Sequence, residues 1–384
     1  MGPAACLSFD MARRAARRRL PRGLFDYVDR GVGQEAALLR LRESLDAVEI
    51  APRVLVSRTD RDIGCTLFGW QARAPLVIAP TAMAGLVHPD GEIVLARAAA
   101  RAGIPVALST QSITSVGRLR AAVPEAEIWM QLYLWQDLDQ SDALIARAAE
   151  AGVRVLVMTV DTPYGARKEW VLRSGFSMPF RPGLRSATDM ALHPGWLWRV
   201  ALRQLLRDGL PKMENYPAGR QPRLVGGPPA PPELALRRDL GWDDVARVRD
   251  RWPGVLILKG ILRDDDALSA ADLGVDGVVV SSHGARNLDA APAPVTVLPG
   301  IAEAVAGRMT VLADSGVRRG LDVLRYRLAG AEAVMLGRLP LWALAAGGAA
   351  GVEAALDWLT AEYREALDFS GAAPGAPPAT SAAE

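Results

Sequence analysis

The chain has 384 residues, of which 50% are hydrophobic and 23% are charged. This composition is typical of a globular protein and excludes a disordered or fibrous one. The net charge of +2 argues against a dedicated nucleic-acid binder, because such proteins usually carry a clear basic excess. The two cysteines, Cys6 and Cys65, have no metal-type spacing, which excludes a disulfide scaffold and a cysteine-rich zinc site, and we expect no metal centre.

Neither end of the chain has the sequence pattern of a secretory signal or a membrane-spanning helix. Residues 13–19 are rich in arginine, which is typical of the solvated face of a first helix. No apolar stretch follows them, as a secretory signal would need, and no apolar run reaches the ~18 residues of a membrane-spanning helix. We therefore expect a cytoplasmic protein. Residues 371–384 are rich in Ala, Pro, Ser and Gly and predict a disordered tail.

Between these ends, short apolar runs alternate with helical stretches. The runs are residues 75–80, 105–109, 128–133, 154–160, 255–259, 277–281, 309–314 and 333–337. They are continuously apolar, as strands buried on both faces should be. The helical stretches are 92–102, 114–122, 141–151, 243–251, 264–273, 298–306 and 320–329. This alternation predicts an α/β protein whose eight units close into a (β/α)8 TIM barrel. An open doubly wound sheet is the alternative, weakened because no G-x-G-x-x-G follows the first strand.

The spacing of the units also predicts the domain organisation. We expect one barrel domain over residues 1–370, with an N-terminal helical and loop segment at 1–74. The fourth strand is followed by a long insertion at 164–240, and a loop of this length is usually a lid or a binding segment. It contains Trp196 and Trp198 beside several arginines. These predict either attachment to a membrane surface or a lid packed on the barrel, and the sequence leaves both open.

Polar side chains gather where the predicted strands end. They are Ser109, Gln131, Tyr133, Thr159, Asp161, Lys259, Ser281, His283, Arg286, Asp314, Arg318 and Arg338. An apolar barrel core needs none of them, and the carboxyl ends of barrel strands are where active sites lie. The sequence therefore predicts one polar site at this rim.

Three features of the rim point to its chemistry. The segment DSGVRRG at 314–320 and the pair Gly337-Arg338 follow strands seven and eight, where barrels often bind phosphate through backbone N–H groups and arginine. Lys259 ends an apolar strand, so its charge requires an anion or an electron-accepting ring. His283, with an imidazole pKa ordinarily near ~6.5, predicts a general base, and Arg286 predicts a two-point contact with a carboxylate.

Taken together, these segments resemble the FMN-dependent α-hydroxy acid oxidase and dehydrogenase family, which includes glycolate oxidase, lactate oxidase, flavin-type lactate dehydrogenase and mandelate dehydrogenase. The resemblance runs from about residue 20 to 371. Its motifs are FDYVDRG at 25–31, APTAM at 79–83, HPDGE at 88–92, QLY at 131–133, TVDTP at 159–163, LKG at 258–260, SHGARNLD at 282–289 and DSGVRRG at 314–320. The ordered set is far more specific than any one motif.

The resemblance implies FMN as cofactor and oxidation of a lactate- or mandelate-like (S)-2-hydroxy acid to the 2-keto acid. Electrons would pass to oxygen or to a carrier, and the protein would be a homotetramer. His283 would be the base, acting on the hydroxyl proton or on the α-carbon proton, and Asp161 would stabilise its protonated form. Arg286, Tyr27 and Lys168 would hold the substrate carboxylate, and Tyr133 would bond near the reacting hydroxyl.

The resemblance also assigns the residues that would hold FMN. Lys259 would lie at the N1/O2 edge of the flavin, where negative charge develops on reduction. Backbone at Pro80, Thr81 and Ala82 would face the N5 side. The ring and ribityl chain would contact Ser109, Gln131, Thr159 and Ser281, and the ribityl chain and phosphate would contact Asp314, Ser315, Gly316, Arg318, Gly337 and Arg338.

Four positions depart from the family pattern. Ser282 replaces the usual Asn before the base, Ser315 replaces a Gly, Lys168 replaces a substrate arginine, and Gln111 stands where glycolate oxidase has a Trp. The pocket should therefore differ from that of glycolate oxidase. Three other functions stay open: a tailoring flavin oxidase acting on a larger hydroxy acid or an amine, a flavin-binding barrel without catalysis, and a phosphate-binding barrel isomerase.

Overall fold

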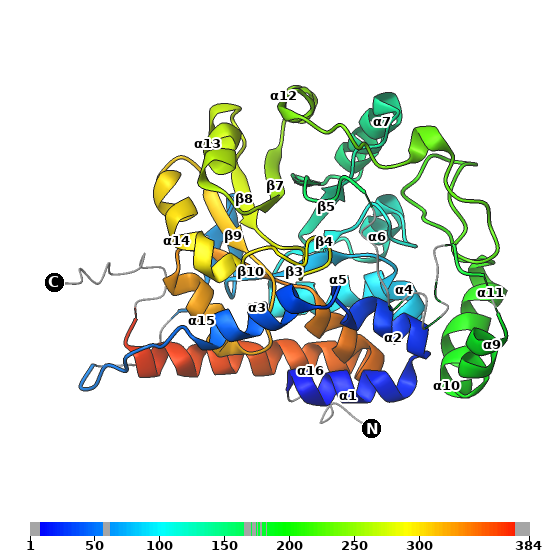
Figure 1. The fold of residues 1–384 in the computed structure, drawn as a ribbon, viewed down its shortest axis with the longest axis horizontal. Coiled ribbons are helices and arrows are strands. Elements are labelled where there is room, and N and C mark those ends of the chain that lie inside the picture. The colour runs from blue at the N-terminus through cyan, green and yellow to red at the C-terminus, as the bar shows by residue number, and fades with distance from the viewer. Residues whose placement is uncertain are drawn as a thin grey trace.

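The computed structural model describes residues 8–56, 62–164, 170, 174, 176, 179–181 and 183–372. Eight parallel strands close into a barrel in the order β10-β3-β4-β5-β6-β7-β8-β9 (Figure 1). They are β3 (Leu76–Thr81), β4 (Val106–Leu108), β5 (Ile128–Leu132), β6 (Val155–Thr159), β7 (Val255–Ile261), β8 (Gly277–Val280), β9 (Thr310–Ala313) and β10 (Ala333–Leu336). Each predicted apolar run forms one strand, so the (β/α)8 barrel is confirmed and the open sheet is excluded.

Helices follow the strands and form the outer layer of the barrel. They are α5 (Gly91–Ala102), α6 (Val116–Ala122), α7 (Leu138–Glu150), α12 (Trp242–Arg251), α13 (Asp264–Asp272), α14 (Pro294–Ala304), α15 (Gly320–Leu328) and α16 (Arg338–Ser370). Each predicted helix is present, with shifted ends. Helix α7 begins three residues early because Asp137 caps it, accepting from the backbone N–H of Asp139 and Gln140.

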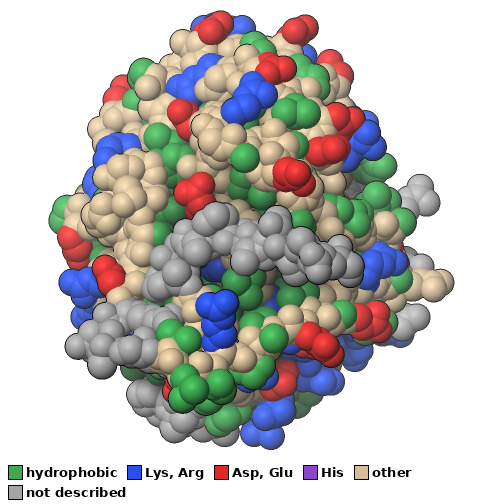
Figure 2. All heavy atoms as spheres, turned by 90° about the vertical axis from the view of Figure 1, so that its left-hand side faces the viewer, with side chains coloured by type: hydrophobic (Ala, Val, Ile, Leu, Met, Phe, Trp, Pro, Cys, Tyr) green, Lys and Arg blue, Asp and Glu red, His purple; other side chains and the backbone are tan. Residues whose placement is uncertain are grey.

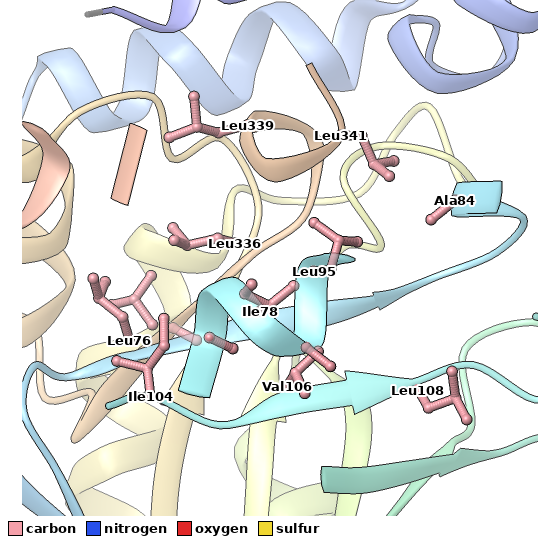
Figure 3. Close-up of a cluster of buried hydrophobic side chains, with 14 of the residues drawn as sticks. Leu76, Ile78, Ala84, Leu95, Ile104, Val106, Leu108, Leu336, Leu339 and Leu341 are labelled. Atoms are coloured by element: carbon pink, nitrogen blue, oxygen red, sulfur yellow. The ribbon is translucent and has the colours of Figure 1, made fainter. Parts of the chain in front are cut away.

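The strands are apolar throughout because both of their faces are buried. On β3, Val77 and Ala79 face the apolar cluster inside the barrel, while Leu76 and Ile78 belong to the cluster under the helices. Figure 3 shows the outer cluster, to which β3, β4, α5, β10 and α16 contribute Leu76, Ile78, Val106, Leu108, Leu95, Leu336, Leu339 and Leu341. Burial on both sides removes the alternating polar pattern of a half-exposed strand.

The N-terminal segment contributes α1 (Phe9–Arg19), α2 (Arg22–Asp29) and α3 (Ala36–Asp46), with α1 lying along α16 (Figure 1). It also contains a short antiparallel hairpin, β1 (Cys65–Leu67) and β2 (Trp70–Ala72), that the sequence analysis did not predict. Phe68 at its turn contacts Trp129 inside the barrel, with ring centroids 5.8 Å apart. The hairpin therefore closes the amino end of the barrel with apolar side chains, and the polar site lies at the other end.

The insertion lies between β6 and β7. Its described helices are α9 (Leu184–Ala191), α10 (Pro194–Trp196), η2 (Leu197–Leu202), α11 (Arg203–Asp208) and η3 (Pro232–Leu234), and α9, α10 and α11 stand on the right of Figure 1. Arg207 makes a two-point ion pair with Asp90, at 2.5 and 2.6 Å. Trp196 Nε1 donates to the carbonyl of Leu86 in α4 (Ala84–Val87) at 2.8 Å. These contacts fix the insertion to the barrel.

Among the described residues, one helix is long and apolar enough to cross a membrane by length and composition alone. This is α16, and 67% of its most apolar window is buried inside the protein. It packs against α1, α5 and α15, and it breaks at Gly348, where φ is 60°. These contacts make α16 a core helix. The predicted disordered tail lies outside the described residues from 373 onward.

Candidate active site

A cavity of about 660 Å³ opens at the carboxyl ends of the barrel strands, with α2 and α3 on its outer side. Its walls include most of the predicted site residues: Tyr27, Pro80, Thr81, Ala82, Ser109, Gln131, Tyr133, Thr159, Lys259, His283, Arg286, Asp314, Ser315, Gly316, Arg318, Gly337 and Arg338. Asp161 and Ser281 lie behind the wall, bonded to residues that line it. Lys168 falls outside the described residues.

His283 and Asp161 form a hydrogen-bonded pair at the centre of the rim. His283 Nδ1 lies 2.9 and 3.1 Å from the two carboxylate oxygens of Asp161. Burial alone would raise the pKa of Asp161, but the charge and hydrogen bond of His283 outweigh it and lower this pKa to about 2. A carboxylate can only accept, so Nδ1 carries a proton, which leaves Nε2 of His283 available for proton transfer.

The turn after β8 presents His283 to the cavity. His283, Gly284 and Ala285 have φ angles of +54°, +64° and +61°, three consecutive left-handed residues. Two of them are not glycine, so the turn is strained, and such strain concentrates at functional sites. The carbonyl of Ala285 accepts from the Val32 N–H at 3.0 Å, which ties the turn to the segment between α2 and α3.

Lys259 is a buried cation at the end of β7. Its Nζ lies 3.0 Å from Asp314 Oδ2 and donates to Ser281 Oγ at 2.9 Å. Burial opposes the charge, but the carboxylates of Asp314 and Asp161 together raise the pKa of Lys259 above its usual value. The lysine is therefore charged, as a group that faces developing negative charge should be.

Arg286 and Arg338 hold the carboxyl end of α2 over the rim. Arg286 Nη1 donates to the Tyr27 carbonyl at 2.7 Å, and its guanidinium lies 5.0 Å from the centre of the Tyr27 ring. Arg338 donates to the carbonyls of Val28 at 3.0 Å and Gly284 at 2.9 Å. Burial and the neighbouring Arg286 lower the pKa of Arg338 to about 10. Cations at a helix C-terminus complement its exposed carbonyls.

The opposite wall of the cavity is a fixed set of neutral hydrogen-bonding groups. Gln131 Oε1 accepts from the Thr110 N–H at 3.0 Å and from Ser109 Oγ at 3.2 Å, and its Nε2 donates to Thr159 Oγ1 at 3.1 Å. These contacts fix the orientation of the amide. Burial and the charge of Asp161 raise the pKa of Tyr133, so its hydroxyl keeps its proton and can donate.

The residues at strands β9 and β10 fit the phosphate end of FMN. The Arg318 guanidinium is half-buried over the Phe9 ring, 5.1 Å from its centre. Burial and Arg42 lower the pKa of Arg318, and within the described ranges no carboxylate lies within ion-pair distance of it. A Cβ on Gly337 would meet nothing within 4 Å, and Gly337 lines the same cavity as Arg318. A half-buried arginine without a carboxylate partner among the described residues, lining one cavity with glycine backbone, suits the binding of a phosphate.

The structure also places residues in the site that the sequence analysis did not assign. Asn287 Nδ2 donates to the Asp161 carbonyl at 2.8 Å and to Thr162 Oγ1 at 3.0 Å, and so helps to hold the carboxylate. His193 of the insertion lines the cavity, and its Nδ1 lies 2.7 Å from the Asp189 carbonyl. Asn287 lies inside the SHGARNLD motif, and its place in that motif could have identified it as a site residue. Nothing local marks His193, because only the folded insertion brings it to the rim.

One cavity thus contains a histidine bonded to a carboxylate, a buried lysine and an arginine that has no carboxylate partner among the described residues. Together with the closed barrel they define a flavin-type oxidoreductase.

Comparisons with known proteins identify the family. The family model described as FMN-dependent dehydrogenase matches residues 16–376. The L-lactate dehydrogenase of Caulobacter vibrioides is 41% identical over 361 residues, covering 94% of this chain and 92% of that protein. Among solved structures, the monotopic membrane protein (S)-mandelate dehydrogenase has a TM-score of 0.87 at 32% identity, covering 96% of each chain. Mandelate oxidase with (S)-2-phenylpropionate has a TM-score of 0.79 at 34% identity, covering 95% of this chain and 94% of the other.

The chain belongs to the FMN-dependent α-hydroxy acid oxidase and dehydrogenase family. The resemblance drawn from its motifs is thereby confirmed, and FMN is its cofactor. It is an FMN-dependent oxidoreductase, which excludes the phosphate-binding isomerase.

Proposed function

We propose that the protein oxidises an (S)-2-hydroxy acid of the lactate or mandelate type to the 2-keto acid, and passes the electrons to oxygen or a carrier. One observation carries the proposal. His283, bonded through Nδ1 to Asp161 at 2.9 Å, lines the same cavity as Arg286 and Lys259. A base, a carboxylate-binding arginine and a cation beside the cofactor are the groups that this oxidation needs.

His283 acts as the base through Nε2. It takes the proton of the substrate hydroxyl or, in the other mechanism, the proton on the α-carbon. In both cases the ring becomes a cation, and the carboxylate of Asp161 stabilises that cation at a distance already suited to a charged hydrogen bond. Asn287 keeps the carboxylate in place through the Asp161 carbonyl.

Arg286, Tyr27 and Tyr133 bind and orient the substrate. The Arg286 guanidinium, stacked on the Tyr27 ring, offers the planar pair of donors that fits a carboxylate. Tyr133, kept protonated by burial and by Asp161, donates to the substrate near its hydroxyl. A contact from Lys168 remains a prediction, because that residue lies outside the described part of the chain.

FMN supplies the two-electron acceptor when it is bound. Lys259 would hold its N1/O2 edge, the backbone of 80–82 its N5 side, and Ser109, Gln131 and Thr159 its ring or ribityl chain. Arg318 and the backbone at Gly316 and Gly337 would hold its phosphate. The hydroxyls of Ser281 and Ser315 and the guanidinium of Arg338, which bond to protein groups in the structure, would add contacts to the ribityl chain and phosphate.

The substrate pocket favours an acid larger than glycolate. Gln111 lines the cavity, and its N–H donates to Ser109 Oγ at 3.1 Å. Glutamine fills less space than the tryptophan that glycolate oxidase is expected to have there, so the pocket can accept a substituent on the α-carbon. Lactate and mandelate both carry one.

Anaerobic mixing with single acids tests the proposal. The FMN-loaded protein is mixed with lactate, mandelate, 4-hydroxymandelate and longer aliphatic acids, and the flavin band near ~450 nm is followed. We expect one class of (S)-acid to bleach the band and its (R)-enantiomer to leave it unchanged. Fast recolouring in air marks an oxidase, and slow recolouring marks a carrier-coupled dehydrogenase. A yellow protein that no acid bleaches would contradict the proposal.

We also propose that the insertion attaches the protein peripherally to a membrane surface. Its helices expose large apolar side chains, with exposed fractions of 90% at Leu184, 79% at Leu192, 70% at Trp198 and 78% at Leu206. Exposed arginines lie among them: Arg185, Arg199 and Arg203. Apolar side chains flanked by basic ones suit the surface of an anionic bilayer, and the similar (S)-mandelate dehydrogenase is described as a monotopic membrane protein.

The insertion has a second face, which is directed at the barrel. Trp196 is half-buried and bonded to Leu86, and His193 lines the cavity. One face of the insertion thus packs on the barrel, as a lid would, and the exposed face is the one we propose for the membrane. By contrast, the surface on the left of Figure 1 carries basic and acidic side chains interspersed (Figure 2). Pelleting with phosphatidylglycerol vesicles tests the attachment, and a protein that stays in the supernatant would contradict it.

The homotetramer implied by the family resemblance remains a prediction.

A further inference from the structure

Two serine hydroxyls hold the turn that carries the proposed base, and each is bonded to one member of a buried ion pair. The His283 N–H donates to Ser281 Oγ at 3.0 Å. Ser281 Oγ also accepts from Lys259 Nζ at 2.9 Å. The next amide along the chain, the Gly284 N–H, donates to Ser315 Oγ at 3.0 Å. Two consecutive peptide groups of the turn are therefore bonded to serines that follow two different strands, β8 and β9.

Ser315 closes these contacts into a ring. Its hydroxyl donates to Asp314 Oδ1 at 2.7 Å, and Asp314 Oδ2 pairs with Lys259 Nζ at 3.0 Å. The ring runs from the His283 amide through Ser281, Lys259, Asp314 and Ser315 to the Gly284 amide. The four side chains are buried, so their hydrogen bonds act in a low dielectric, where members of a chain strengthen one another.

The backbone of Ser315 has a conformation that is unusual for serine. Its φ is +81°, in the left-handed region that glycine adopts freely and serine rarely adopts. Glycine is also the residue that the family pattern leads us to expect there. A serine keeps such a conformation only where its surroundings fix it. The Tyr326 hydroxyl holds the backbone here, at 2.7 Å from the Ser315 carbonyl. The Ser315 hydroxyl adds contacts to Asp314, to the Gly284 N–H and to the N–H and Oγ of Ser282 at 3.3 and 3.2 Å.

We infer that Ser315 is a positioning residue whose hydroxyl locks the left-handed turn 283–285, so that His283 stays against Asp161 with Nε2 directed into the cavity. The inference rests on the proposed role of His283 as the base. Through the ring, the alignment of the base depends on the same Lys259–Asp314 pair that adjoins the cofactor. Within the described part of the chain, Ser315 has no hydrogen bond to Tyr27, Tyr133 or Arg286, so we expect its effect on the base to pass through the turn.

Three variants of the FMN-loaded protein separate the hydroxyl from the backbone. Ser315→Ala removes the hydroxyl and keeps the constraint of a Cβ. Ser315→Gly removes the hydroxyl and relaxes the φ angle. Ser282→Ala is the matched control, because it removes one neighbouring hydroxyl and leaves the bonds of Ser315 to Gly284 and Asp314 intact.

Hydrogen–deuterium exchange of the peptides that cover residues 282–286 measures how firmly the amides of the turn are hydrogen-bonded. We expect the Gly284 amide to exchange about tenfold faster in both Ser315 variants and within about twofold of wild type in Ser282→Ala. With FMN saturating, kcat should fall about tenfold in the Ser315 variants while KM stays within about twofold, because the carboxylate-binding groups are unchanged.

Exchange in Ser315→Ala equal to that of wild type would overturn the inference, whatever the activity. An effect confined to Ser315→Gly would also overturn it, because the backbone and not the hydroxyl would then be responsible. A failure of the proposed function is a different result. In that case a variant of His283 keeps its turnover, and the exchange of the Gly284 amide still reports whether Ser315 holds the turn.

Discussion

The barrel rim and the insertion beside it use charged and apolar side chains in opposite ways. At the rim charged side chains from different strands are paired, buried in Lys259–Asp314 and half-buried in His283–Asp161. In the insertion several large apolar side chains are exposed, as at Trp198 and Leu206, while charged side chains form surface pairs such as Arg207–Asp90. Buried charges are retained where chemistry requires them, and exposed apolar groups where a surface is contacted. The two regions should therefore be separable by mutation.

The largest effect is expected at the rim. Arg286→Met removes a two-point contact with the substrate carboxylate, and we expect kcat/KM to fall about 10³-fold, because each charge-assisted hydrogen bond contributes roughly 1.5–3 kcal/mol. Arg286→Lys keeps the charge without the planar fork and should lose less, about 10²-fold. Steady-state kinetics with the best acid measures both values. Vesicle binding should be unchanged in both variants. A loss of binding would contradict the claim that the rim and the insertion act independently.

The next effect belongs to the insertion. The double variant Trp198→Ser and Leu206→Ser should weaken binding to anionic vesicles about tenfold or more, since each large apolar side chain contributes roughly 1.5–3 kcal/mol when fully buried. Its kcat with a soluble acceptor should stay within about twofold of wild type. The matched control is Leu39→Ser with Phe369→Ser, two exposed apolar residues elsewhere, which should pellet as wild type does. Equal pelleting of the two double variants would contradict membrane attachment.

The smallest effect is a pH dependence of stability. The pKa of Asp161 lies near 2 in the folded protein, below its ordinary value of 3.8. A carboxylate with a lowered pKa stabilises the fold above its unfolded pKa, and this stabilisation is lost as the pH falls through the folded value. The difference in free energy of unfolding between wild type and Asp161→Asn should therefore shrink by about 1 kcal/mol between pH 7 and pH 3. Urea titrations measure it, and a difference that stays constant or widens would contradict the pairing with His283.

The barrel and most of its rim were predictable because their signals are local. Strands buried on both faces read as continuous apolar runs, and residues such as Lys259 and His283 stand where those runs end. The hairpin of β1 and β2 was not predicted, because each of its strands has three residues and no pattern of that length identifies a strand.

Other parts of the site depend on contacts that no local pattern encodes. The motifs contained Asp314 and Ser315, but the ring that joins them to Gly284 exists only once β7, β8 and β9 lie side by side. The sequence also offered no reason to assign different environments to Trp196 and Trp198. The fold separates them, with Trp196 bonded to the barrel and Trp198 exposed, because a helix presents neighbouring residues to different sides.

The most direct test of the account is the rate of flavin bleaching in a single anaerobic turnover, compared between wild type and His283→Asn. Asparagine tolerates the left-handed backbone found at His283, where φ is +54°, so the turn and the bound FMN should be retained. With the acid that reduces wild type fastest, the account predicts a rate about 10³- to 10⁴-fold slower in the variant, the loss expected for a missing general base. A rate within tenfold of wild type would show that His283 is not the base.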